Sequence, residues 1–263
     1  MSPMPFQSYL KELWHYRYLV WKLAATDFNL RYKKSLLGLF WALLEPLLML
    51  LVLYTVFSNL MRLQVQHYQL FLLMGIIGWN FFARSTSMSL SSIIGKPSLV
   101  KKIYFPRELL VMSSCVTALM MSLVEFLVFG VFMVFFQIWP GSAILLAIPA
   151  LAVFFILCLG VSLALAAVNT FFRDVQYIWA VVLQVGFFAT TVVYTVDVFP
   201  PDLRFAFSLN PITQFLEVLR NSVIYAKLPS IFAMGGLLAV SFLALAFGAF
   251  VFKRFEPGFA EEL

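Results

Sequence analysis

Long apolar segments, separated by short polar ones, dominate the pattern of the chain. Six of them extend over about 20 residues with few charged side chains, the length that an α-helix needs to cross ~30 Å of hydrocarbon. These segments are residues 38–60, 70–92, 109–136, 143–169, 177–196 and 231–252. Apolar and polar residues do not alternate within them, as they would in the strands of a membrane barrel. The pattern therefore predicts an all-α integral membrane protein with six transmembrane helices.

The composition excludes an ordinary soluble domain. Apolar residues make up 63% of the 263 residues and charged residues 11%, whereas soluble proteins have about 25% charged residues. Cys115 and Cys158 lie within apolar segments, where each acts as a small apolar side chain and predicts no disulfide. The chain is also too apolar for a disordered protein.

The basic residues predict the orientation of the helices. Of the 18 lysines and arginines, 13 lie in residues 1–37, 93–108, 170–176 and 253–263, four lie in the predicted outside segments, and Arg84 lies within a predicted span. Because cytoplasmic loops carry the excess of Lys and Arg, we expect both termini in the cytoplasm. The same distribution accounts for the net charge of +6 without a nucleic-acid partner.

The two ends of the chain flank the predicted membrane domain. Residues 1–37 place Trp14 and Trp21 near helical spacing, with basic residues between them, which favours an amphipathic helix in the membrane interface. A helix that docks a partner protein is the alternative. We therefore expect an interfacial segment at 1–37, a membrane domain at 38–252 and a cytoplasmic tail at 253–263.

The segment between the fifth and sixth predicted spans is too apolar for an exposed loop and too interrupted to cross the membrane. Pro200-Pro201 and Asn210-Pro211 divide it, and Asn before Pro is typical of a helix N-terminus. We expect two short re-entrant helices here, because irregular backbone at membrane depth is tolerated only where it is buried or lines a wet cavity. The segment therefore indicates a gate or pore mouth, with a small extracellular cap as the alternative.

Side chains for catalysis are scarce. His15 and His67 fall on opposite sides of the membrane in the predicted topology, and the chain has no Walker A, HExxH or GxSxG motif. We therefore expect a chain that is not an enzyme and binds no cofactor itself. A membrane glycolipid transferase is an alternative that only Asp174 beside Arg173 favours.

Three charged residues fall within the predicted spans: Glu45, Arg84 and Glu125. Charges at membrane depth are costly and indicate function by default. Glu45 and Arg84 could pair with each other or extend towards the cytoplasmic face, whereas the deeper Glu125 would serve packing or conformational coupling.

The cytoplasmic loop at 95–108 is basic and contains Ile103, Tyr104 and Phe105 just before a proline. A mere connection does not need exposed apolar and aromatic residues. The loop is therefore either a docking surface for another protein or an interfacial anchor with positive-inside lysines.

Five segments resemble the permeases of ABC-2 type transporters, most closely the branch that exports O-antigen, capsule and teichoic-acid polymers. They are RYKKSLLGLFWALLEP at 31–46, KKIYFPRE at 101–108, NTFFRDV at 169–175, LNPITQF at 209–215 and FEPGFA at 255–260. The resemblance extends over nearly the whole chain, with the segments in the family's order.

The resemblance implies a permease that pairs with a second copy of itself and with two copies of a separate ATPase, which binds ATP and Mg²⁺. The substrate would be a polysaccharide on a lipid such as undecaprenyl pyrophosphate, moved from the cytoplasmic to the outer leaflet of the bacterial inner membrane. The coupling helix that docks the ATPase would contain Lys96, Leu99, Lys101, Lys102, Ile103, Tyr104, Phe105, Pro106 and Arg107. The outer gate would contain Pro200, Pro201, Asn210, Pro211 and Phe215.

Such a substrate requires cations and aromatic rings. Arg31, Lys33 and Lys34 would attract the diphosphate headgroup, although positive-inside anchoring explains them equally well. Sugar rings stack on aromatic faces, and the candidates for the substrate path are Phe40, Trp41, Tyr177, Trp179, Phe187, Phe188 and Tyr194. Lipid contact and helix packing are the alternative roles of these residues. An ABC-2 exporter of a small drug or lipid would share the fold, with a narrower and more apolar path.

Overall fold

The computed structural model describes residues 14–33, 38, 40–60, 65–102 and 105–262. These residues form helices joined by turns and contain no strand, as the apolar pattern predicts. The longer helices are α2 (Arg17–Tyr32), α3 (Phe40–Tyr54), α4 (Tyr68–Leu90), α6 (Glu108–Phe135), α7 (Ala147–Phe171), α8 (Val175–Phe188) and α11 (Ile231–Phe255). The shorter ones are α5 (Pro97–Lys102), α9 (Pro201–Ser208), α10 (Pro211–Leu219) and α12 (Phe259–Glu262). Single 3-10 or π turns are η1 (Thr55–Leu60), η2 (Ser142–Leu146), η3 (Val196–Val198), η4 (Arg220–Ile224) and η5 (Glu256–Gly258).

Helices occupy all six predicted spans, and among the described residues four helical segments are long and apolar enough to cross a membrane. These are Phe40–Ser58, Glu108–Phe135, Ser142–Phe171 and Ile231–Glu262. α4 is long, but Arg84 and several Ser and Thr residues make it more polar than these four. α8 ends at Phe188, before the predicted end of the fifth span at residue 196. That α4 and α8 cross the membrane stays a prediction.

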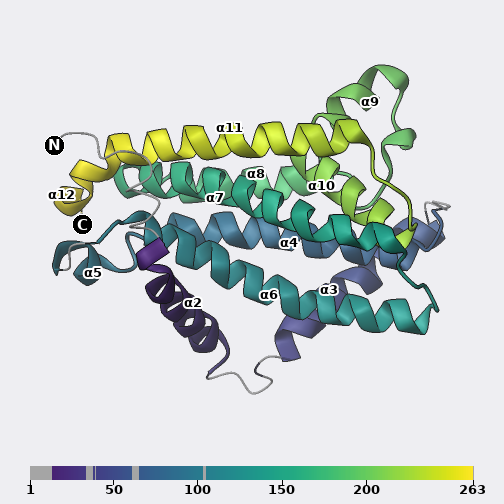
Figure 1. Ribbon diagram of the computed structural model, residues 1–263, viewed down its shortest axis with the longest axis horizontal. Coiled ribbons are helices and arrows are strands. Elements are labelled where there is room, and N and C mark those ends of the chain that lie inside the picture. Colours follow the sequence, from purple (N-terminus) through teal and green to yellow (C-terminus); the bar gives the residue numbers. More distant parts are fainter. Residues whose placement is uncertain (1–13, 34–37, 39, 61–64, 103–104, 263) are drawn as a thin grey trace.

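α4, α6, α7, α8 and α11 run side by side, α2 and α3 lie at an angle to them, and the two ends of the bundle hold different elements (Figure 1). α5 and α12, which belong to segments predicted to be cytoplasmic, lie at one end, and α9 and α10 lie towards the other. α4 is the central helix and contacts α3, α6, α7, α8 and α10. Most of its side chains are therefore buried.

Two apolar clusters stabilise the bundle. In the cluster around α4, Phe154 of α7 stacks on Phe215 of α10 with ring centroids 3.8 Å apart. The second cluster lies at the end that holds α5 and α12, where Phe105 packs with Phe252 and Phe259. The second cluster therefore joins the predicted coupling loop to the C-terminal helices.

Small residues allow α7 and α11 to approach closely, and these two helices make the most extensive contact between described elements. A Cβ atom on Gly248 would overlap the carbonyl group of Gly160, and one on Gly160 would overlap the backbone of Ala244. Close backbone contact of this kind is a common way for helices to associate in lipid.

α2 packs on the bundle through small residues and not through its aromatic ones. Val20 and Ala24 are buried, and the hydroxyl of Thr117 on α6 donates to the carbonyl of Ala24 at 3.3 Å. Trp14 and Trp21 are instead exposed. The aromatic side of α2 is therefore free to lie in the membrane interface, where Trp side chains are enriched.

We predict that Gly248→Val destabilises the protein, because the new side chain would force α7 and α11 apart. Overpacking of this kind costs about 1–3 kcal/mol. The midpoint of thermal unfolding in detergent should fall by several degrees. Gly235→Val is the matched control on the same helix, since a Cβ atom on Gly235 would meet no other atom within 4 Å. Equal midpoints for the two variants would contradict the close helix contact.

Candidate functional site

One arginine joins three helices of the predicted membrane domain. A guanidinium nitrogen of Arg84 on α4 lies 2.9 Å from a carboxylate oxygen of Glu45 on α3. The other terminal nitrogen lies 2.6 Å from a carboxylate oxygen of Glu125 on α6. The side chain of Glu125 is fully buried and that of Arg84 is 10% exposed, whereas that of Glu45 is 60% exposed. The expected pairing of Glu45 with Arg84 is therefore present, and Glu125 joins it.

Glu45, Arg84 and Glu125 form a charge cluster, and a cavity of about 720 Å³ lies beside it. The cavity lies between the C-terminal end of α2 and the helices α3 and α4. Its lining is Arg31, Tyr32, Trp41, Ala42, Glu45, Leu48, Met49, Val52 and Asn80. The cavity thus brings a predicted headgroup residue, Arg31, together with a predicted path residue, Trp41. Leu48, Met49 and Val52 give it an apolar wall that is exposed on the outside of the chain.

The three predicted headgroup residues are close in sequence, but the structure describes only two. Arg31 and Lys33 are both exposed at the end of α2. Arg31 lines the cavity, whereas Lys33 is not part of its lining. Lys34 lies outside the described residues.

The predicted path residues do not share one surface. Trp41 is the one of the seven that lines the cavity, and Phe40 beside it is exposed. On α8, Tyr177 and Phe188 are also exposed. These four residues are accessible to a lipid, a substrate or another chain.

The other three predicted path residues pack inside the chain. Phe187 is buried edge-on against an aromatic ring of α4. Trp179 donates its indole N–H to the hydroxyl of Thr86 at 3.0 Å, and the half-buried Tyr194 donates its hydroxyl to the carbonyl of Phe188. In the described structure these three side chains therefore stabilise the helix bundle.

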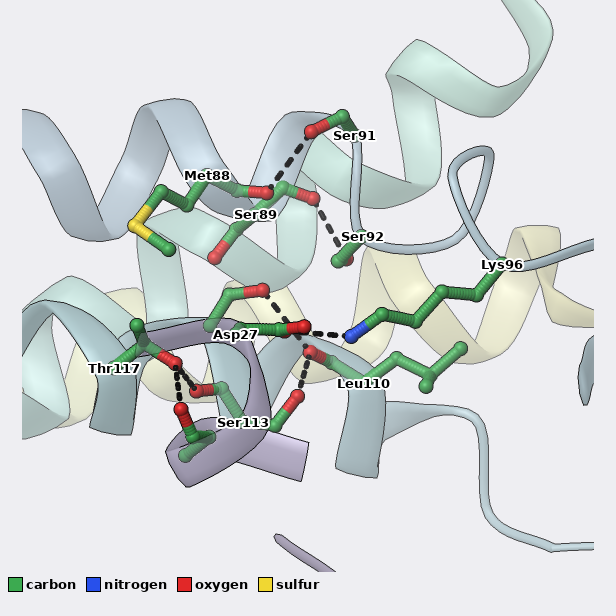
Figure 2. Close-up of polar contacts among 11 residues, drawn as sticks. Asp27, Met88, Ser89, Ser91, Ser92, Lys96, Leu110, Ser113 and Thr117 are labelled. Carbon is green, nitrogen blue, oxygen red and sulfur yellow. Dashed lines mark hydrogen bonds and ion pairs between the residues drawn. The ribbon is translucent and has the colours of Figure 1, made fainter. Parts of the chain in front are cut away.

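The predicted coupling loop is attached to neighbouring helices at both of its ends. Nζ of Lys96 lies 2.6 Å from a carboxylate oxygen of Asp27 on α2. Figure 2 shows this ion pair together with Ser89, Ser91 and Ser92 at the end of α4. At the other end of the loop, Arg107 donates to the carbonyl of Glu256 at 2.5 Å. The loop therefore cannot move far without α2 and the end of α11.

α5 turns one side towards the protein. Val100 is 5% exposed and Leu99 is partly buried, whereas Lys101 is exposed. The side chain of Lys102 and the whole of Ile103 and Tyr104 lie outside the described residues. Among the described side chains of α5, the exposed ones are Pro97, Ser98 and Lys101, so this side carries one positive charge.

The end of the loop packs inward. Phe105 is 9% exposed and belongs to the second apolar cluster, and Pro106 and Arg107 are partly buried. Phe105 therefore anchors the end of the loop in the second apolar cluster. Replacing it with a charged residue would test folding more than docking.

Sequence reasoning missed three polar residues around these sites: Asp27, Tyr32 and Asn80. A signal was available for the first, since Asp27 and Arg31 are four residues apart and thus share one face of a helix. The same face of α2 contacts the loop through Asp27 and the cavity through Arg31.

The two short helices expected between the fifth and sixth spans are present as α9 and α10. The side chain of Asn210 accepts from the backbone N–H of Ile212 at 2.9 Å, and Pro211 occupies the first helical position, as predicted. Phe215 is fully buried, while Pro200 and Pro201 are exposed. Their role in a gate stays a prediction.

Arg220, directly after α10, anchors this end of the bundle. It is 4% exposed and donates to the carbonyls of Phe71, Thr191 and Val192 at 2.6–3.2 Å. The last two carbonyls lie in the turn after α8, and carbonyls at a helix end need donors from outside the helix. Burial lowers the pKa of Arg220 to about 9, so it stays charged at neutral pH.

A second cavity, of about 360 Å³, lies at this end and is lined by Arg220, Asp197 and Glu217 among others. Burial raises the pKa of Glu217 above its ordinary value. The cavity therefore brings the carboxylates of Asp197 and Glu217 onto the same lining as Arg220.

Comparisons with known proteins agree with the resemblance. The family model described as ABC-2 type transporter matches residues 18–224. An O-antigen export system permease protein RfbA from Klebsiella pneumoniae is 29% identical over 242 residues, 90% of this chain and 92% of its own length. A protein of the same name from Myxococcus xanthus is 30% identical over 259 residues, 97% of this chain and 98% of its own length.

The family match extends over most of the elements described above. It begins within α2 and ends at η4, so it includes the charge cluster, the first cavity, the coupling loop and the two short helices. The long apolar helices are those of a multi-pass membrane protein. The chain therefore belongs to the ABC-2 type transporter family, as a membrane permease subunit.

Proposed function

We propose that this chain is the permease of an ATP-driven exporter that moves a lipid-linked polysaccharide from the cytoplasmic to the outer leaflet of the bacterial inner membrane. The observation that carries the proposal is the first cavity, which combines a cation, an aromatic ring and an apolar wall. The similarity to O-antigen export permeases from K. pneumoniae and M. xanthus supports the same class of substrate.

Each part of the cavity suits one part of a polyprenyl-diphosphate-linked glycan. Arg31 offers a guanidinium group, which pairs with phosphate oxygens in a bidentate manner. Trp41 offers a flat ring for a sugar, and Leu48 and Met49 offer apolar surface for the prenyl chain. A wholly apolar ligand would offer Arg31 no group of matching charge.

The exposed side of α5 is the proposed docking site for a separate ATPase subunit. Lys101 points outward, while Val100 and the contacts of Lys96 and Arg107 hold the loop to the bundle. A displacement of α5 by a closing ATPase would therefore be passed to α2 and α11. ATP and Mg²⁺ belong to that subunit in this proposal, and this chain binds no cofactor.

The proposed transporter contains two copies of this chain and two of the ATPase. α8 supports this, because it packs on the bundle along one side and exposes apolar and aromatic residues along the other. The exposed residues are Tyr177, Ile178, Val181, Val182, Val185 and Phe188. A second copy facing α8 would enclose a path lined by aromatic rings, and α9 and α10 would close its outer end.

An exporter of a small drug or lipid is the second candidate. The exposed apolar wall of the cavity, formed by Leu48, Met49 and Val52, favours it. Stimulation of the ATPase by hydrophobic drugs, and not by lipid-linked glycans, would distinguish it from polysaccharide export.

Deletion of the gene tests the proposed function. We expect loss of a surface polysaccharide together with accumulation of its lipid-linked precursor on the cytoplasmic leaflet, because synthesis continues while export stops. Gel analysis of surface glycans and mass spectrometry of the lipid fraction would measure the two effects. An unchanged glycan profile would contradict polysaccharide export and favour the second candidate.

Lys101→Glu tests the docking side of α5. Placing a negative charge where a complementary surface expects a positive one costs affinity, so we expect a several-fold loss of export and of co-purifying ATPase. The protein should still fold, since Lys101 is exposed. Arg254→Glu is the matched control, because Arg254 is exposed near the end of α11, outside α5. If both variants lose the ATPase equally, overall charge and not α5 determines docking.

A further inference from the structure

Arg84 has two carboxylate partners, and they differ in how easily a ligand could displace them. Arg84 contacts two carboxylates at once, at 2.9 Å for Glu45 and 2.6 Å for Glu125. Glu125 is fully buried between helices, so it has no route to water while the bundle is folded. Glu45 is 60% exposed and lines the cavity. Within the cluster, Glu45 is therefore the displaceable counter-ion of Arg84.

Because the side chain of Glu45 is exposed and lines the cavity, we expect water or a polar ligand in the cavity. A carboxylate in contact with hydrocarbon is costly, and charged residues at membrane depth usually face a wet cavity or a charged partner. The cavity also holds Arg31 at its rim. Its charged side therefore suits an ionic ligand, and its apolar wall suits a lipid chain.

Tyr32 is within electrostatic range of both arginines. Tyr32 lines the cavity next to Arg31. Burial raises the pKa of Tyr32, and the charges of Arg31 and Arg84 both oppose that rise. Arg84 is not part of the cavity lining, but it contacts Glu45, which is.

α3 has a built-in point of bending directly after Glu45. Pro46 lies inside the helix and has no N–H to donate to the carbonyl of Ala42, which is also in the cavity wall. A proline inside a helix removes a backbone hydrogen bond and is the usual cause of a kink. Glu45 can thus move away from Arg84 without unfolding α3.

We propose that the phosphate groups of a polyprenyl-linked substrate displace Glu45 from Arg84, so that Arg84 and Arg31 hold the headgroup between them while Glu125 keeps Arg84 in place. Leu48, Met49 and Val52 contact the first part of the prenyl chain. The inference rests on the proposed function and adds to it the residue that receives the headgroup and the carboxylate that competes with it.

Binding of undecaprenyl pyrophosphate to the full-length chain in phosphatidylethanolamine nanodiscs tests this inference. Glu45→Gln removes the competing charge and keeps the shape of the side chain, so we expect affinity to rise about fivefold, within the range of ordinary coupling between sites. Arg31→Gln should weaken binding. Lys22→Gln is the control, since Lys22 is an exposed cation on α2 that does not line the cavity. Unchanged or weaker binding by Glu45→Gln would overturn the displacement.

A double substitution identifies Arg84 as the receiving group. Arg84→Gln alone would leave Glu125 as an unpaired buried charge and endanger folding, so it is combined with Glu125→Gln. In this background we expect weak binding, and Glu45→Gln should no longer strengthen it. If Glu45→Gln still strengthens binding in this background, Arg84 does not receive the headgroup.

Two further probes separate the sources of the phosphate group. Inorganic pyrophosphate and phosphatidylglycerol should each bind more weakly than undecaprenyl pyrophosphate, because they lack the prenyl chain or the second phosphate. Equal binding of either would overturn the assignment to a polyprenyl lipid. The gene deletion distinguishes failure of this inference from failure of the proposed function. If the deletion abolishes the surface glycan but Glu45→Gln does not change binding, the proposed function is supported and only this inference is contradicted.

Discussion

Arg84 joins α3, α4 and α6, because its guanidinium group is shared between the carboxylates of Glu45 and Glu125. Buried ion pairs add little net stability, yet removing one partner costs about 3–5 kcal/mol, since the other charge stays unpaired in an apolar setting. The buried part of this interaction, between Arg84 and Glu125, therefore has to stay intact, whereas the exposed Glu45 ties α3 to it more loosely. The first cavity lies beside this interaction, with Glu45 in its wall.

The cavity and the coupling loop are connected through α2. Asp27 pairs with Lys96 at the start of the loop, and one helical turn later Arg31 lines the cavity. α2 itself is held to α6 by small buried residues, Val20 and Ala24. One helix therefore contacts both the coupling loop and the proposed substrate site. The opposite end of the bundle is separately anchored by Arg220, whose guanidinium group satisfies carbonyls after α8.

The sequence predicted the helices well, because runs of apolar residues near 20 in length have few other stable arrangements in lipid. It also predicted the Asn210 cap and the pair of short helices, since proline and asparagine act locally. It could not show that Phe105 packs inward, because its partners Phe252 and Phe259 are distant in sequence. It named the charges at membrane depth but not their geometry, since contact among Glu45, Arg84 and Glu125 depends on how three helices pack.

Transport in proteoliposomes would show whether the charge cluster around Arg84 is needed to export a lipid-linked glycan. The permease and its ATPase would be reconstituted with a fluorescent lipid-linked oligosaccharide, and its transfer between leaflets would be followed by loss of accessibility to a membrane-impermeant quencher. We expect transfer that requires ATP and is lost when Arg84 and Glu125 are both replaced by Gln, in a protein that still folds. ATP-dependent transfer that is unaffected by this double substitution, or no transfer of the glycan by the intact complex, would contradict it.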